Sequence, residues 1–370
     1  MTLPRILTIM GSGETAPTMV TTHRMLAAKL PKPARATLLD TPYGFQENAP
    51  ELATKAVEYF STSINITLDV AGLTQMIGAD ALAVERGLQL VSDAQYVFAG
   101  PGSPTYALRQ WAGTPLAGLL TKKLRDGGIV TFASAAALTL GRFTLPVYEI
   151  YKVGEEPRWL EGLNILGEIG INAALIPHYN NAEGGHHDTR FCYMGERRLS
   201  VMETELPDEV FVLGVDEHTG LMLDLDANTA TVVGKGVISL RLRGATTEIA
   251  SGEVFSIDRL RNPVRLGWGL ESDGSLSDDA RLRALNCLEK FGERLREYPS
   301  RSVRIVGTKT LRSISDSRQF LLDAQQRLGH PLGSAAARSM ATCLTGSYAA
   351  SLDGSTSRRS STSITLSPGD

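Results

Sequence analysis

The first half of the chain alternates short apolar runs with longer stretches that have helical periodicity. The runs that predict strands are Arg5–Met10, Ala36–Leu39, Ile64–Val70, Ala94–Ala99 and Gly128–Ala133. This alternation is typical of an α/β fold, in which helices cover both faces of a mainly parallel sheet. We therefore expect a doubly wound sheet in this part of the chain.

Turn-rich segments follow several of these strands, at Gly11–Gly13, Thr41–Gly44, Gly100–Ser103 and around Ser134. In open α/β sheets, ligands bind beyond the carboxyl ends of the strands. The turn-rich segments are therefore expected to converge, and functional residues are sought among them.

The pattern changes from about Ile171 onward, where shorter runs are spaced like an antiparallel meander. These runs are Phe211–Val215, Leu221–Leu225, Thr229–Val233 and Gly236–Leu242. The α/β domain is accordingly expected to span residues 1–257.

Two further segments are expected after this domain. Residues 258–300 are expected to form a helical extension, because Ser277–Tyr298 carries Leu282 and other apolar residues at helical spacing. Residues 301–370 are expected to form a weakly structured to disordered tail, since the chain from about Leu344 is rich in Ser and Thr.

The charge balance excludes some classes of partner. The 370 residues include 37 Lys and Arg against 40 Asp and Glu, which gives a formal net charge of −3. This balance argues against binding nucleic acid through a basic surface and against attraction to anionic membranes. No nucleic-acid or membrane partner is expected.

The cysteines, Cys192, Cys287 and Cys343, are odd in number and widely spaced. They suggest neither a disulfide framework nor a CxxC metal site, and a reducing compartment is the default. No run approaches the ~18 apolar residues of a membrane span. A cytoplasmic location is therefore expected.

The segment Gly128–Leu138 has the strongest local signal for chemistry, because an apolar strand runs into Ser134, three alanines and a helix. A nucleophilic serine is often held on such a tight strand-to-helix turn, beside backbone N–H groups that can bind an oxyanion. The glycines that usually flank the serine are replaced by Phe132 and Ala136. A serine that caps the helix is the alternative.

The segment Ile176–Arg190 holds three of the six histidines. His178 follows a predicted strand, where a general base serving Ser134 would be needed, although a lone histidine is more often structural. A metal site built from His178, His186, His187, Asp188 and His218 is a weaker alternative. Adjacent histidines do not readily point the same way, so no metal is expected.

The segment Gly214–Gly220 contains Asp216, Glu217 and His218 between two predicted strands. Its carboxylates would either cap a hairpin or orient a histidine base, as the acid of a catalytic triad does.

The Gly100–Pro104 turn would be purely structural or would supply an oxyanion donor. Pro101 has no N–H, so the Gly102 amide is chosen as one donor and the Ala135 amide as the other.

Dinucleotide binding is a further interpretation of the N-terminal loop. Gly11–Ala16 fits the pattern G-x-G-x-x-A after a strand, and Asp40 ends the next predicted strand. This pattern is frequent by chance and leaves Ser134 and the histidine cluster unexplained, so no cofactor is expected.

Taken together, the Ser134 turn, Pro177–Tyr179, Gly214–Gly220 and the Gly100–Ser103 loop resemble the cyanophycinase and aspartyl dipeptidase group of serine peptidases. The resemblance covers about Leu7 to Ile257. It implies the class I glutamine amidotransferase-like α/β fold.

The resemblance also implies roles for individual residues. Ser134 would be the nucleophile, His178 the base and Glu217 the acid, with Glu149 as the second choice of acid. Glu14 would meet a substrate amine, and the implied substrates are β-aspartyl or N-terminal aspartyl peptides.

The leading interpretation is a serine-type hydrolase that cleaves a small peptide through an acyl-enzyme. Asn180, Asp188 and Arg190 are further candidates for substrate binding, because a guanidinium can grip a carboxylate bidentately. A homodimer is considered as its oligomeric state. The alternative function is a binding protein that uses the same scaffold without catalysis, motivated by the missing elbow glycines.

Overall fold

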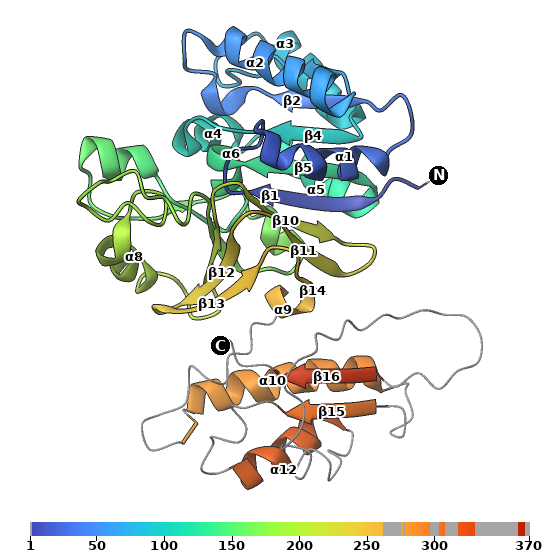
Figure 1. Ribbon diagram of the computed structural model, residues 1–370, viewed down its shortest axis with the longest axis vertical. Coiled ribbons are helices and arrows are strands. Elements are labelled where there is room, and N and C mark those ends of the chain that lie inside the picture. The colour runs from blue at the N-terminus through green and yellow to red at the C-terminus, as the bar shows by residue number, and fades with distance from the viewer. Residues whose placement is uncertain are drawn as a thin grey trace. The chain divides into compact units, whose positions relative to one another are not determined.

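The computed structural model describes residues 2–261, 275–276, 278–296, 303–307, 317–329 and 362–366. The chain divides into two compact units, Met1–Ile257 and Asp258–Asp370, coloured blue to yellow and orange to red in Figure 1. The finer division into 1–257, 258–300 and 301–370 stays a prediction.

An eight-stranded sheet forms the centre of the first unit, in the order β14-β11-β10-β1-β5-β4-β2-β3. Five strands run parallel: β1 (Arg5–Met10), β2 (Ala36–Leu39), β3 (Leu68–Val70), β4 (Tyr96–Ala99) and β5 (Gly128–Ala133). The antiparallel strands are β10 (Thr219–Asp224), β11 (Thr229–Gly234) and β14 (Val254–Ser256). Every residue of β5 is buried, as expected for a strand covered on both faces.

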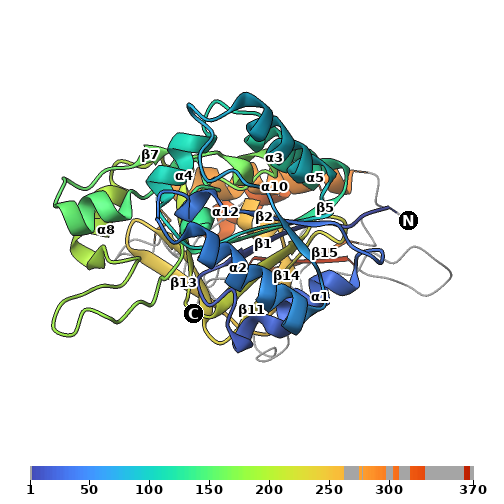
Figure 2. The ribbon, with the colours of Figure 1, turned by 90° about the horizontal axis from the view of Figure 1, so that it is seen from above.

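Helices cover both faces of this sheet. Figure 2 shows α3 (Ala81–Asp93) and α5 (Leu116–Asp126) on one side, and α1 (Val20–Ala28) and α2 (Ala49–Tyr59) on the other. The shorter helical elements of the region are α4 (Pro104–Trp111), α6 (Ser134–Leu138), η1 (Pro17–Met19), η2 (Thr41–Tyr43) and η3 (Phe60–Ile64). The predicted doubly wound α/β arrangement is confirmed.

The predicted strand Ile64–Val70 is shortened at its beginning. Residues 60–64 instead form a π-helical turn, η3, that continues α2 and buries Phe60 and Ile64. Asn65 adopts a left-handed conformation with φ +61° and ends this turn, so only Leu68–Val70 pairs with the sheet.

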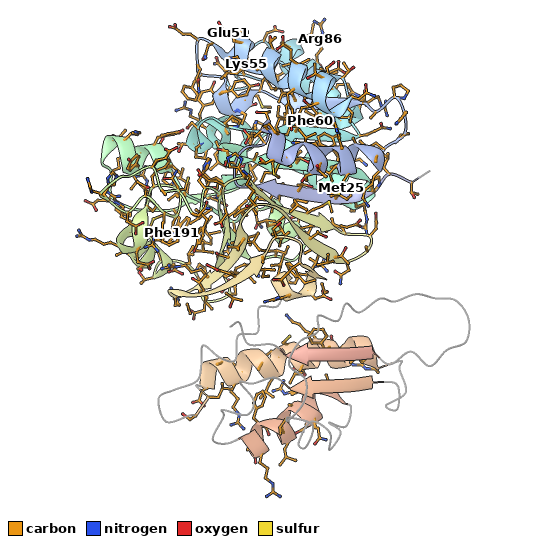
Figure 3. The ribbon with its side chains drawn as sticks, viewed as in Figure 1. Met25, Glu51, Lys55, Phe60, Arg86 and Phe191 are labelled. Atoms are coloured by element: carbon orange, nitrogen blue, oxygen red, sulfur yellow. The ribbon has the colours of Figure 1, made fainter. Side chains whose placement is uncertain are left out.

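A second, six-stranded sheet has the order β13-β12-β9-β8-β6-β7. Its strands are β6 (Phe143–Thr144), β7 (Leu160–Glu161), β8 (Ala173–Ile176), β9 (Phe211–Val215), β12 (Val237–Leu242) and β13 (Ala245–Ala250). The helical elements that accompany it are η4 (Glu149–Val153), α7 (Ile165–Glu168) and α8 (Gly195–Glu203). Figure 3 shows Phe191 on the α8 side of this unit.

The predicted antiparallel meander is wrong as a single sheet. β9 and β12 pair in the second sheet, whereas β10 and β11 between them belong to the first. Residues 216–218 carry the chain across: the Asp216 N–H donates to Val237 O, and the Gly11 N–H donates to Thr219 O. The turn is therefore tied to both sheets.

The second unit contains the described elements α9 (Asp258–Arg261), α10 (Asp278–Leu295), β15 (Val303–Gly307), α12 (Ser317–Leu328) and β16 (Thr362–Leu366). Leu288 on α10 and Phe320 on α12 are buried, but Leu282 is 53% exposed, contrary to its predicted place on the apolar face. β15 and β16 pair in parallel. Regular elements thus occur within 301–370, and the rest of the predicted tail lies outside the described residues.

Across the parts of the chain that the structure describes, no helix has the length and apolar character needed to cross a membrane.

Candidate active site

The carboxyl ends of the parallel strands lie side by side. The Ala136 N–H donates to Gly100 O at 3.2 Å, which joins the turn after β5 to the turn after β4. The Ser103 N–H donates to Pro42 O at 2.8 Å, which joins the turns after β4 and β2. These contacts bring the turn-rich segments together at one edge of the first sheet.

Ser134 lies on a sharp turn between β5 and α6, with its backbone in the left-handed region at φ +49°. A non-glycine residue in this region is strained, and such strain is common at functional sites. The Ser134 Oγ lies 2.9 Å from His178 Nε2. The N-cap residue of α6 is Ala133 and makes no side-chain cap, so the interpretation of Ser134 as a capping serine is wrong.

The turn is formed without its usual glycines because its neighbours are small or well packed. Phe132 is fully buried and packs against Trp111, with ring centroids 5.8 Å apart. Ala135 and Ala136 are buried, and Ala136 lies directly beside Gly100. The sharp conformation of Ser134 is thus accommodated by small alanines on the helix and anchored by the hydrogen bond from Ala136 N–H to Gly100 O.

His178 follows β8 and also has a left-handed backbone, with φ +48°. Its carbonyl accepts the N–H groups of Asn181 at 3.1 Å and Cys192 at 3.2 Å. Its Nδ1 lies 2.8 Å from Glu217 Oε1. The ring therefore lies between a serine hydroxyl and a carboxylate.

The hydrogen-bond partners determine the tautomer of His178. Because a carboxylate only accepts hydrogen bonds, Nδ1 carries the ring proton and donates to Glu217. Nε2 of the neutral ring then accepts the hydrogen bond from the Ser134 hydroxyl. This is the direction that a base acting on the serine requires. The side chains of His178 and Glu217 are 23% and 31% exposed, so the pair remains open to solvent on one side.

The other candidate acids have different partners. Glu149 accepts the hydroxyl of Thr105 at 2.9 Å, on the α4 side of the site. Asp216 accepts the Val237 N–H at 3.0 Å, and burial raises its pKa above the ordinary value. Of these carboxylates, Glu217 is the one that contacts His178.

The proposed oxyanion donors have free amides at the expected places. Gly102 has φ +142°, and a Cβ there would lie 2.0 Å from Pro42 O, so this position requires glycine. Within residues 2–261, neither the Gly102 N–H nor the Ala135 N–H has a hydrogen-bond acceptor. Both amides therefore remain available to a ligand.

The loop after β1 packs against the turn that holds the acid. A Cβ on Gly11 would lie 2.0 Å from Asp216 O, and one on Gly13 would lie 2.3 Å from the ring of His218. The close packing of these loops accounts for both glycines. The loop glycines are thus explained by packing against the 216–218 turn, with no need for a bound dinucleotide.

Glu14 lies in the same loop and is only 7% exposed. A Cβ on Gly100 would lie 3.3 Å from its Oε1, so the carboxyl group lies at the turn after β4. Burial raises the pKa of Glu14, while the nearby His178 and His218 lower it less strongly. In the described residues, no other side chain forms a hydrogen bond with this carboxyl group.

His23, which sequence reasoning missed, holds the Glu14 loop from beneath. It is fully buried, and its Nε2 lies 2.7 Å from Glu14 O while its Nδ1 lies 2.8 Å from Tyr96 Oη. Since a carbonyl only accepts, Nε2 carries the proton and Nδ1 accepts the tyrosine hydroxyl. The aromatic rings of Phe60 and Phe98 surround it.

We expect His23 to make the first unit less stable in acid. Burial lowers its pKa from 6.5 to about 4, so the unfolded chain takes up a proton before the folded one does. Its contribution is complete above pH 6.5, and about 3 kcal/mol is lost as the pH falls from 6.5 to about 4. The measurement is the free energy of unfolding at several pH values, for the natural chain and for His23→Gln. The difference between them should shrink by this amount in acid, and a constant difference would contradict the assignment.

The remaining candidates for substrate binding contact protein groups. Arg190 donates to both carboxylate oxygens of Asp188, at 2.9 and 2.8 Å, and this pairing lowers the pKa of Asp188. Asn180 Oδ1 accepts the Glu217 N–H at 2.8 Å, so Asn180 faces the acid. A substrate carboxylate would have to compete with Asp188 for Arg190.

The histidines considered as metal ligands lie in different surroundings. His187 Nε2 lies 3.4 Å from Tyr151 Oη, and His218 Nδ1 lies 3.0 Å from Thr18 Oγ1. Among the described residues, no three His, Cys, Asp or Glu side chains are placed to hold a metal ion.

One family model matches a segment in the second half of the chain. The Ppx/GppA phosphatase family matches residues 246–334. Two relatives named guanosine-5'-triphosphate,3'-diphosphate pyrophosphatase, from Vibrio cholerae and Vibrio vulnificus, are 42% identical over 81 residues, which is 22% of this chain and 16% of each relative. The chain thus spans about a sixth of the length of these curated relatives.

Two solved structures are similar over most of their own length. One is a peptidase from an acI-B1 actinobacterium, with 21% identity, a TM-score of 0.55 and coverage of 69% of this chain and 97% of that one. The other is a Listeria monocytogenes protein described as a putative peptidase E, with 14% identity, a TM-score of 0.42 and coverage of 62% and 98%. The likeness to the actinobacterial peptidase confirms the predicted fold class: this chain and that peptidase share a mixed α/β fold.

Proposed function

We propose that the first unit is a serine-type peptidase that uses Ser134, His178 and Glu217 as its catalytic triad. One observation carries the proposal: Ser134 Oγ, the His178 ring and Glu217 Oε1 form a continuous chain of hydrogen bonds. In that chain the neutral imidazole accepts the serine proton, which is the arrangement that serine hydrolases use on several unrelated folds.

The reaction would proceed in two stages. His178 Nε2 takes the Ser134 proton as Oγ attacks the scissile carbonyl, and the Gly102 and Ala135 amides bind the oxyanion. The imidazolium, stabilised by Glu217, then gives its proton to the leaving amine, and an acyl-enzyme remains. Water attacks the ester with His178 again as the base, which releases the acid and restores the serine.

Cys192 is an unsuitable alternative nucleophile, although its backbone contacts His178. It is 4% exposed, and burial raises the pKa of its thiol to about 12. A buried thiol of this kind stays protonated and unreactive at neutral pH.

The proposed substrate is a small peptide with a free amino group next to an aspartyl residue, cleaved by exopeptidase, dipeptidase or isopeptidase action. Glu14 supports the amine, because its carboxyl group is buried near His178 and has no partner side chain in the part of the chain described. An ammonium group would restore the interactions that the carboxylate loses on burial. The aspartyl preference is supported by the family resemblance alone.

Replacing Glu14 with glutamine should lower kcat/KM for aspartyl dipeptides with a free amino terminus by about 10- to 100-fold, the value of a charge-assisted hydrogen bond. The same dipeptides with an acetylated amino terminus are the matched control. They should be poor substrates for the natural chain, and E14Q should change their hydrolysis little. An equal loss on both substrates would show that Glu14 acts on the fold and not on the amine.

Two other functions can be compared with this one. A protein that binds peptides without cleaving them would keep affinity for the dipeptides and show no turnover. Phosphatase activity is a second candidate, favoured by the Ppx/GppA match over residues 246–334. We assign no reaction to the second unit, because that match spans only a small part of the relatives. A cytoplasmic location and a homodimer remain proposals.

A further inference from the structure

Two consecutive asparagines connect the histidine loop to the acid. Asn180 Oδ1 accepts the Glu217 N–H at 2.8 Å, and Asn181 Nδ2 donates to Glu217 Oε1 at 3.4 Å. Oε1 is the same oxygen that accepts the hydrogen bond from His178 Nδ1–H. The pair Asn180 and Asn181 thus contacts both the backbone and the carboxylate of Glu217.

Neighbouring backbone groups determine the orientation of Asn181. The residue is 1% exposed, its N–H donates to His178 O at 3.1 Å, and its Oδ1 accepts the Glu183 N–H at 3.2 Å. Because Oδ1 must face a donor, the Nδ2 group is the one that faces Glu217.

We propose that Asn180 and Asn181 are positioning residues, which hold Glu217 in the one orientation that keeps the His178 ring correctly placed for Ser134. The inference rests on the proposed function. A carboxylate oxygen that accepts two N–H donors is held in one rotamer. Asn180 holds the backbone of Glu217 in place. The Asn181 amide donates to Oε1, the carboxylate oxygen that faces the His178 ring, and so keeps this oxygen aimed at the imidazolium.

The Tyr193 hydroxyl interacts with the Asn181 side chain through a hydrogen bond and donates to Glu183 Oε2, whereas the other charged or titratable groups near this pair act through space. Glu14 and His178 influence each other, and Asp216 and Cys192 are close enough to Glu217 for electrostatic coupling. Among the described residues, His178 and Asn181 are the side chains that donate a hydrogen bond to Glu217 Oε1. Asn181 is the neutral one of these two donors, so replacing it with an acidic residue adds a negative charge beside Glu217 Oε1.

The first test replaces Asn181 with aspartate, which keeps the acceptor for Glu183 but puts a second carboxylate against Glu217. The titration of His178 is followed by NMR of its ring Cε1–H signal, assigned with His178→Gln. We expect the midpoint to move up by about one pH unit, because the added negative charge favours the imidazolium.

Asn65→Asp is the matched control, since Asn65 is exposed and precedes the amino end of β3, the outermost strand of the first sheet, whereas the site lies beyond the carboxyl end of the central strand β5. It adds the same charge far from the site and should leave the His178 midpoint in place. An unchanged midpoint in Asn181→Asp would overturn the inference, as would an equal shift in the control.

Asn180 supplies a second test that leaves the buried residue intact. Asn180→Ala should lower kcat about tenfold with KM within about twofold, whereas Asn180→Asp keeps the acceptor for the Glu217 N–H and should retain most of kcat. Equal losses in both variants would count against the positioning role. The NMR measurement needs no turnover. The positioning role of the two asparagines can therefore fail while the proposed peptidase activity stands, and the activity can fail while the positioning role stands.

Discussion

Replacing Ser134 with alanine should lower the hydrolysis of aspartyl dipeptides by about 10⁴-fold or more, because members of a serine triad act as a unit. The substitution removes only the Oγ. Alanine is close to serine in size and also occupies the three positions that follow. The variant should therefore fold normally and still bind the dipeptides. The measurement is the initial rate of dipeptide cleavage at saturating substrate.

Ser61→Ala is the matched control for this substitution. Ser61 is exposed and lies in η3, which precedes the outermost strand β3, whereas Ser134 follows the central strand β5. It should retain full activity. Comparable rates for Ser134→Ala and the natural chain would rule out Ser134 as the nucleophile.

Replacing Arg241 with methionine should lower the free energy of unfolding of the first unit by about 3–5 kcal/mol, because it leaves a buried charge unpaired. The side chains of Arg241 and Glu203 are 3% and 4% exposed, and the Arg241 Nε donates to Glu203 Oε2 at 2.8 Å. The guanidinium also lies 5.2 Å from the ring centroid of Phe191. Denaturant unfolding followed by tryptophan fluorescence measures the loss, since Trp111 is fully buried in this unit.

Two controls separate an unpaired charge from a general loss of packing. Arg125→Met removes an exposed arginine whose side chain is 69% accessible, and it should change stability by no more than about 1 kcal/mol. Adding Glu203→Leu to Arg241→Met removes the stranded carboxylate and should recover much of the loss. No recovery in the double variant would contradict this explanation.

Arg241 also stabilises the loop that carries the base. The Phe191 N–H donates to Tyr179 O, and the next residue, Cys192, donates to His178 O. Phe191, Cys192 and Tyr193 all have positive φ, a left-handed turn that costs conformational energy and requires support from its surroundings. Reduced activity in Arg241→Met, beyond the loss of folded protein, would follow from loosening this turn.

Much of the site could be predicted from sequence because its residues follow strands. Arg5–Met10, Ala36–Leu39 and Gly128–Ala133 are strands with the predicted boundaries, since their apolar β-branched runs end in turns. A strand end determines where the next side chain can lie, so the sequence alone predicts that Ser134 and His178 lie at the carboxyl ends of strands. The preference for Glu217 over Glu149 follows from the family resemblance and not from spacing.

Other features depend on contacts between distant segments, for which the local sequence has no signal. The turn at 216–218 belongs to both sheets, so the even spacing of the strands around it suggested one meander. Arg190 carries a guanidinium that could bind a substrate carboxylate, but it pairs with Asp188. Asn180 faces Glu217 instead of a substrate. The local sequence has no signal for the burial of His23 and Arg241, because that burial depends on tertiary packing.

The proposed triad is tested most directly by covalent capture of its nucleophile. The natural chain should react with a fluorophosphonate probe to give a single adduct, which peptide mass spectrometry places on Ser134. His178→Gln should react far more slowly, because the base that activates the hydroxyl is gone. No adduct on the natural chain, an adduct on another residue, or undiminished labelling of His178→Gln would contradict the account.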